Sequence, residues 1–159
     1  MNATLPGIHH VTAIVGDAQR NLDFYSDTLG LRLVKLTVNF DDPGTYHLYF
    51  GDAAGQPGTI ITFFPWGEAA PRGRRGSGQV TATAFSVAEG ALDFWADRLA
   101  ARGVETRESS RFGERILAFS DPDGLELELA AHPGADARPG QSRGDIPHAF
   151  AIRGLHSVT

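Results

Sequence analysis

The sequence contains no cysteine and only one methionine among its 159 residues. The lack of cysteine excludes disulfides and thiolate ligands, so any metal must be bound by histidine, aspartate or glutamate. No apolar run approaches the roughly 18 residues that a membrane-spanning helix requires. Residues 1–7 have neither the basic cluster nor the apolar stretch of a secretory signal. We therefore expect no membrane association and a cytoplasmic location.

Positive charge is also scarce, since 14 Lys and Arg residues face 19 Asp and Glu residues, for a net charge of −5. A nucleic-acid-binding surface needs a basic stripe, so we expect no nucleic-acid partner. The one basic cluster, at 72–75, lies among Gly, Pro and Ser, and we interpret it as a solvated connector. The apolar fraction of 42% is typical of an ordinary globular domain with a substantial core.

A short internal repeat organises the chain. NLDFY at 21–25 recurs as ALDFW at 91–95, and each copy lies in an apolar stripe with helical spacing. Gly30 and Gly103 follow the two stripes and are expected to end the helices in the left-handed conformation. One strand-like run precedes each helix and three follow it. These runs are 9–15, 31–40, 46–51 and 58–66 in the first unit, and 79–87, 104–109, 115–120 and 125–130 in the second.

The repeat predicts an α+β fold of two βαβββ modules, 1–68 and 69–131, whose mixed sheets form a partly closed cup with the helices outside. Segment 132–153 is rich in Pro and Gly and is expected to be a linker. GLHSVT at 154–159 nearly repeats GIHHVT at 7–12, so we expect it to be the first strand of a truncated third module. A module missing its partners would leave a sheet edge open, which favours a homodimer.

The paired βαβββ repeat resembles the vicinal-oxygen-chelate superfamily, which includes glyoxalase I, bleomycin-resistance proteins and extradiol dioxygenases. More narrowly, GIHHVT, VNFDDPGTYHLYFGD, GQPGTIITFFPW and RFGERILAFSDPDG resemble the ring-cleaving dioxygenases that open hydroquinones. The likeness extends from about residue 7 to residue 159. It implies the N-terminal half of a four-module enzyme that acts on a small aromatic substrate with dioxygen.

The resemblance also implies a metal centre and its residues. The metal would be Fe(II), with Mn, Ni or Zn as alternatives, held by two histidines and one glutamate. His10 corresponds to one ligand, whereas the other two would come from a fourth module that this sequence lacks. His9 and Thr12 match positions near the substrate. His156 aligns with His9 and is not expected to be a ligand.

The residues alone support part of this picture. Because side chains alternate along a strand, His10 and Thr12 share one face and His9 lies on the other, so one histidine of the pair is expected to point into the cup. Glu126 and Glu128 share a face opposite the leucines between them. Glu128 is therefore a second candidate metal ligand, and the alternative for it is a solvated carboxylate on a strand.

Other polar and aromatic residues have plainer interpretations. Only one of Tyr46 and His47 is expected to face the cup, and we favour aromatic packing in a core strand for this pair. Trp66 and Trp95 are expected in the core. His132 lies in the predicted linker and carries no signal.

Three functions remain open from the sequence. The first is the N-terminal half of a non-haem Fe(II) ring-cleaving dioxygenase, whose two imidazoles and one carboxylate would leave coordination positions for substrate and dioxygen. The second is a complete two-module glyoxalase-like metalloenzyme with its site across a homodimer, between His10 of one subunit and Glu128 of the other. The third is a metal-free small-molecule-binding module of the resistance type. The linker followed by a restarting module favours the first.

Overall fold

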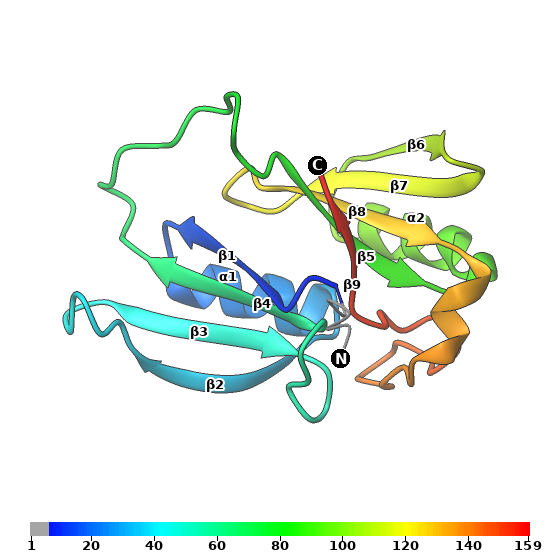
Figure 1. Cartoon of the computed structure of the whole chain (residues 1–159), viewed down its shortest axis with the longest axis horizontal. Coiled ribbons are helices and arrows are strands. Elements are labelled where there is room, and N and C mark those ends of the chain that lie inside the picture. Colours follow the sequence, from blue (N-terminus) through cyan, green and yellow to red (C-terminus); the bar gives the residue numbers. More distant parts are fainter. Residues whose placement is uncertain (1–6) are drawn as a thin grey trace, which may run out of the picture.

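The structure is a computed structural model that describes residues 7–159. The expectation about a secretory signal concerns residues 1–7, and residues 1–6 lie outside the described part. Two units follow one another along the chain (Figure 1). The first consists of β1 (His10–Val15), α1 (Ala18–Asp23), the π-helix η1 (Phe24–Thr28), β2 (Arg32–Val38), β3 (Tyr46–Gly51) and β4 (Ile60–Pro65). The second consists of β5 (Ala82–Val87), η2 (Glu89–Ala91), α2 (Leu92–Ala100), β6 (Thr106–Arg111), β7 (Glu114–Ser120) and β8 (Glu126–Ala131). A short helix η3 (Pro133–Ala137) and the strand β9 (Leu155–Val158) come last.

Each unit has its own sheet, with strand orders β1-β4-β3-β2 and β6-β7-β8-β5-β9. The first strand of each unit is parallel to the last, and the remaining pairs within each unit are antiparallel. Strand β9 pairs antiparallel with the outer edge of β5. Among the described residues, no strand covers the corresponding edge of β1. The predicted α+β fold with cupped mixed sheets is confirmed.

The helix ends follow local chemistry. The side chain of Asp17 accepts a hydrogen bond from the backbone N–H of Arg20 at 2.7 Å and so caps the start of α1. Gly30 (φ 74°) and Gly103 (φ 72°) adopt the left-handed conformation after the first and second helical segments, as expected. The π-helical turn η1 between α1 and Gly30 was not expected from the repeat.

One continuous apolar core joins the two units. Tyr25 of the first unit and Phe85 and Trp95 of the second are fully buried in it. In Figure 1, α1 lies behind the first sheet and α2 behind the second. The expectation that Trp66 belongs to the core is wrong, because it follows β4 directly and 54% of its surface is exposed.

Two buried polar contacts also link the units. The hydroxyl of Tyr25 donates to the carboxylate of Asp121 at 3.0 Å, and Arg98 of α2 donates to the carbonyls of Asp27 and Thr28 at 2.8 Å each. Segment 132–153 packs against this assembly, since Ile146, Ala151 and Ile152 are among its buried residues. No helix in the described range 7–159 has the length and apolarity to cross a membrane.

Candidate functional site

The face of the first sheet that points away from the helices carries a group of polar side chains, which we call the His10 face: His10, Thr12, His47, Tyr49 and Thr62. Along β1, Val11, Ala13 and Val15 turn toward the helices and the core, so strand alternation turns His10 and Thr12 outward. The β1–β4 register places Thr12 opposite Thr62, and their hydroxyls are 2.9 Å apart. The predicted positions of His10 and Thr12 therefore share one accessible surface.

His9 also reaches this surface. It precedes β1, so strand alternation does not separate its ring from that of His10 as expected. The two Nδ1 atoms are 3.1 Å apart, with the rings at an interplanar angle of 83°. One Nδ1 must donate and the other accept. When Nδ1 of His10 is the donor, its Nε2 carries the lone pair that binds a metal.

His47 extends the polar group. Its Nε2 lies 3.0 Å from the Thr62 hydroxyl, and Tyr49 bonds its Nδ1 at 2.9 Å. Its ring stacks on Phe64 with centroids 3.9 Å apart. His47 therefore faces the same side as Thr12, and it combines the expected aromatic packing, on Tyr49 and Phe64, with hydrogen bonds that were not expected. Thr12, Thr62, His47 and Tyr49 form a continuous hydrogen-bonded chain.

Burial is the main cause that lowers the pKa of His47, and the neighbouring Lys35 and His10 lower it further. A histidine whose pKa is lower in the folded state stabilises the fold above its unfolded pKa of about 6.5, and this contribution is lost as the pH falls through the folded value. We expect a His47→Gln variant to lose less stability than the wild type between pH 7 and pH 4. Urea unfolding at several pH values measures this, and identical pH dependences would contradict it.

Glu128, the second predicted ligand, lies on β8 in the other sheet. Arg111 donates two hydrogen bonds to its carboxylate, at 2.6 and 3.2 Å. The neighbouring Glu126 accepts from Arg75 at 3.0 Å and from Arg107 at 2.9 Å. Glu128 is thus held by a bidentate arginine in its own unit, and the structure does not bring it together with His10.

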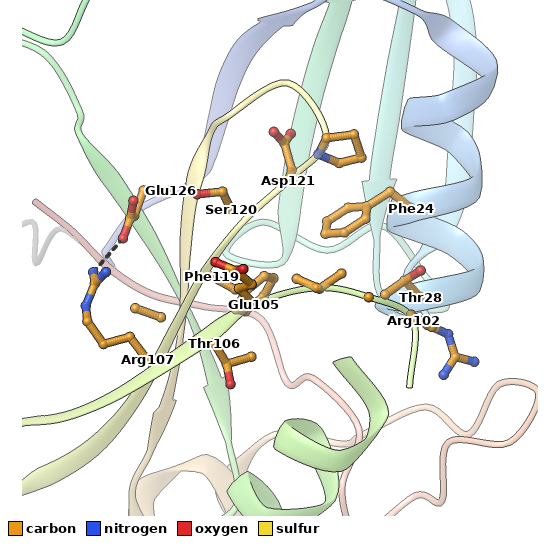
Figure 2. Close-up of a pocket in the computed structure, with 14 residues that line it drawn as sticks. Phe24, Thr28, Arg102, Glu105, Thr106, Arg107, Phe119, Ser120, Asp121 and Glu126 are labelled. Carbon is orange, nitrogen blue, oxygen red and sulfur yellow. Dashed lines mark hydrogen bonds and ion pairs between the residues drawn. The ribbon is translucent and has the colours of Figure 1, made fainter. Parts of the chain in front are cut away.

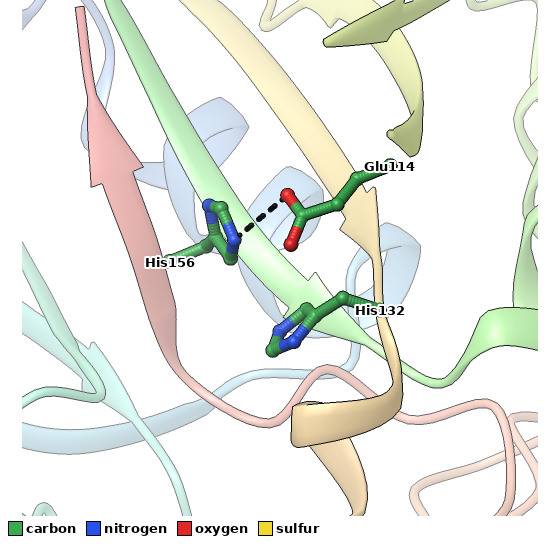
Figure 3. A group of neighbouring side chains, drawn as sticks. All are labelled: Glu114, His132 and His156. Carbon is green, nitrogen blue, oxygen red and sulfur yellow. Dashed lines mark ion pairs between the residues drawn. The ribbon is translucent and has the colours of Figure 1, made fainter. Parts of the chain in front are cut away.

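A different group has the spacing of metal ligands. Glu114, His132 and His156 each offer one ligand atom, and these atoms lie within 4.8 Å of one another (Figure 3). This group was not expected from the sequence, because His132 lies in the predicted linker and His156 aligns with His9. The β7–β8 register pairs Arg115 with Ala131, which places Glu114 beside His132. The pairing of β7 with β8 could have been predicted from the sequence, and with it the closeness of Glu114 and His132. The pairing of β9 with β5, which brings His156 to them, could not.

A cavity of about 610 Å³ lies between η1, the α2–β6 connection and strands β6 to β8 (Figure 2). Its described lining contains no histidine. An ion pair between Arg107 and Glu126 lies at one end, and Asp121 in its wall already accepts bonds from Tyr25 and from the backbone N–H of Leu125. Burial raises the pKa of Asp121 above its ordinary value. This cavity is separate from the His10 face, and none of its described carboxylates belongs to a close group of three ligand-type side chains.

The repeated units and the histidine-bearing sheet face define a class of protein. Residues 7–129 match the Glyoxalase/Bleomycin resistance protein/Dioxygenase superfamily, and the chain belongs to it. Within this class the chain is similar to ring-cleaving dioxygenases. The chain is 52% identical over 153 residues to MhqO of Bacillus subtilis (strain 168), which is named as a ring-cleaving dioxygenase. It is 38% identical over 156 residues to the chlorohydroquinone/hydroquinone 1,2-dioxygenase of Sphingobium indicum.

A solved structure supports the same relationship. A crystal structure of a protein from Bacillus subtilis, titled as a dioxygenase, superimposes with a TM-score of 0.88 at 50% identity. These alignments cover 96% of this chain but only 48% of MhqO, 49% of the Sphingobium enzyme and 48% of the crystallised chain. The chain therefore spans about half the length of the relatives it matches.

Proposed function

We propose that this chain is the N-terminal half of a non-haem Fe(II) ring-cleaving dioxygenase for hydroquinone or catechol-type aromatics, with His10 as one iron ligand. The resemblance to dioxygenases over 96% of the chain supports the reaction class. The observation that carries the proposal is the His10 imidazole itself. It is exposed on the sheet face away from the core, and with its Nδ1 donating to His9 its Nε2 would carry the lone pair for a ligand role.

The donor chemistry of His10 fits iron, but a ligand set needs more than this residue. In the described part of the chain, the ligand-type side chains grouped within 4.8 Å of one another do not include His10. We propose that a further module supplies a second histidine and a carboxylate. Strand β9 covers the edge of β5, and β1 is the equivalent strand of the first unit. A strand of another module paired with β1 would lie beside His10 as β9 lies beside β5.

The bound iron would supply the oxidative chemistry by binding dioxygen and a substrate hydroxyl. This chain's own residues would bind and orient the ring. Ile14 and Phe64 are paired neighbours on β1 and β4, on the same side as Thr12 and Thr62, and offer apolar contact. Lys35 lies 5.2 Å from the ring centre of Tyr49 and brings positive charge to the face, which favours a phenolate.

The hydrogen-bonded chain that begins at Thr12 would receive the substrate's hydroxyl proton. As the Thr12 hydroxyl accepts this proton, it would pass its own proton to the Thr62 hydroxyl, which would pass its proton to Nε2 of His47. A neutral imidazole is required at the end of this chain, and the lowered pKa of His47 supplies it. We also predict that the protein forms a homodimer and is located in the cytoplasm.

Removal of iron tests the proposal. We expect the longer protein containing this chain to consume one dioxygen per hydroquinone ring, and a chelator to lower this rate at least about 100-fold. Added Fe(II) should restore the rate and Zn(II) should not, because zinc has no redox chemistry. Ring cleavage that persists without iron would contradict the proposal. Stoichiometric metal and lyase activity in the 159-residue chain would favour the two-module metalloenzyme instead, and saturable metal-free ligand binding would favour the binding module.

A further inference from the structure

We propose that Glu114, His132 and His156 form a second metal site, in the second unit, for a divalent first-row transition ion. We call this group the Glu114 cluster. It lies on the other sheet from His10 and is independent of the dioxygenase centre. Its three side chains come from the start of β7, from the residue after β8 and from β9.

The distances suit such an ion. The three candidate ligand atoms lie within 4.8 Å of one another, and Nε2 of His156 is 3.1 Å from a carboxylate oxygen of Glu114. Ligand atoms about 2.1 Å from a tetrahedral zinc are about 3.4 Å apart. The Glu114–His156 contact is already about this short. The widest separation is at most 4.8 Å and would have to close by no more than about 1.4 Å, within the reach of side-chain rotation.

The sheet beneath the cluster leaves room for it. Glu114 and His156 come from β7 and β9, which are separated by β8 and β5. Between them, the β5–β8 register pairs Ser86 with Ala130, and both side chains are small and buried. Larger residues at these two positions would fill the space above the sheet. Figure 3 shows the Glu114 carboxylate and the two imidazoles converging over these strands.

Neighbouring groups orient both imidazoles as ligands. The hydroxyl of Ser157 lies 2.9 Å from Nδ1 of His156, which directs Nε2 toward Glu114. Nε2 of His132 lies close to the Ser86 hydroxyl. An ion bound to that Nε2 would replace the Ser86 contact and have the hydroxyl oxygen nearby. Partners on the far ring nitrogen are typical of metal-binding histidines.

The surrounding charges permit a cation. The positive charge of Arg111 acts on Glu114, but Glu128 binds the Arg111 guanidinium through two hydrogen bonds and offsets it. Two imidazoles and one carboxylate favour Zn(II), Co(II), Ni(II) or Fe(II) over Mg(II) and Ca(II), which prefer all-oxygen sites. The bound ion would attach β9, which repeats the opening motif of the chain, to β7 and β8 of the second unit.

Titration of the chelator-treated 159-residue chain with Zn(II) tests the site by calorimetry, with Co(II) absorption in the visible range as a spectroscopic check. We expect saturable binding at this site, and a raised Tm because the ion binds the folded state. His156→Ala and Glu114→Gln should each weaken this binding at least about 10-fold. The exposed His148→Ala serves as a matched histidine deletion that leaves it unchanged, and His10→Ala tests whether zinc binds at the His10 face instead.

Two outcomes would overturn the proposal: no saturable binding, or binding that survives in both cluster variants and disappears with His10. Circular dichroism shows whether each variant folds, and Glu114→Gln keeps the size of the side chain, so at least one variant remains informative. The measurement does not depend on oxygen consumption. If the chain does not bind zinc at the Glu114 cluster, the dioxygenase proposal is unaffected. If the protein binds zinc there but has no dioxygenase activity, the metal site stands and the dioxygenase proposal fails.

Discussion

Replacing His10 with alanine is expected to lower kcat/KM for hydroquinone about 1,000-fold or more in the longer protein. The physical reason is that catalysis requires iron held beside the substrate, and one of its ligands would be lost. A 1,000-fold loss corresponds to about 4 kcal/mol of transition-state stabilisation. Oxygen-electrode rates with matched iron contents measure it.

Because His10 is exposed, the His10→Ala variant should change activity without changing stability. Its side chain faces away from the core, so the free energy of unfolding should change by less than about 0.5 kcal/mol. His9→Ala removes the partner of Nδ1 but no ligand atom, and should cost only about 10- to 100-fold. Rates that are equal for wild type and His10→Ala, or a larger loss from His9 than from His10, would contradict the assigned roles.

Local patterns in the sequence predicted much of the fold. The run 46–51 coincides with β3, and the helix stops at Gly30 and Gly103 are left-handed as expected. These features depend on short-range rules, namely alternation, helical spacing and the steric freedom of glycine. The arrangement of the units depends on long-range contacts such as Tyr25 with Asp121, which no local pattern contains.

The candidate sites show the same division. The strand alternation of β1 correctly placed His10 and Thr12 on one face, but the contact between His9 and His10 arises where the strand has not yet begun. From the sequence, Glu128 could be either a metal ligand or a solvated carboxylate. In the structure its partner is Arg111 on β6, which no local pattern indicates. His156 comes near Glu114 and His132 only because β9 pairs with β5, a contact between segments about 70 residues apart.

The largest stability effect is expected at Arg98, whose side chain is only 4% exposed. Its guanidinium donates to the carbonyls of Asp27 and Thr28 in the first unit and forms an ion pair with Asp145 in segment 132–153. Truncation to alanine would leave the two carbonyls at the end of η1 without their donor and open a gap between the units. We expect Arg98→Ala to lower the free energy of unfolding by about 3–5 kcal/mol.

The neighbouring Arg102 is the matched control, because it also reaches Asp145 but is 32% exposed. Arg102→Ala should cost less than about 1 kcal/mol. Arg98→Lys keeps the charge but has one nitrogen in place of the guanidinium fork, so it should fall between the two. Urea denaturation measures all three. A single cooperative transition that shifts as a whole in Arg98→Ala would mean that the two units unfold as one body, as their shared core requires. Loss of only one of two separate transitions would contradict this, and with it the role of Arg98 as the link between them.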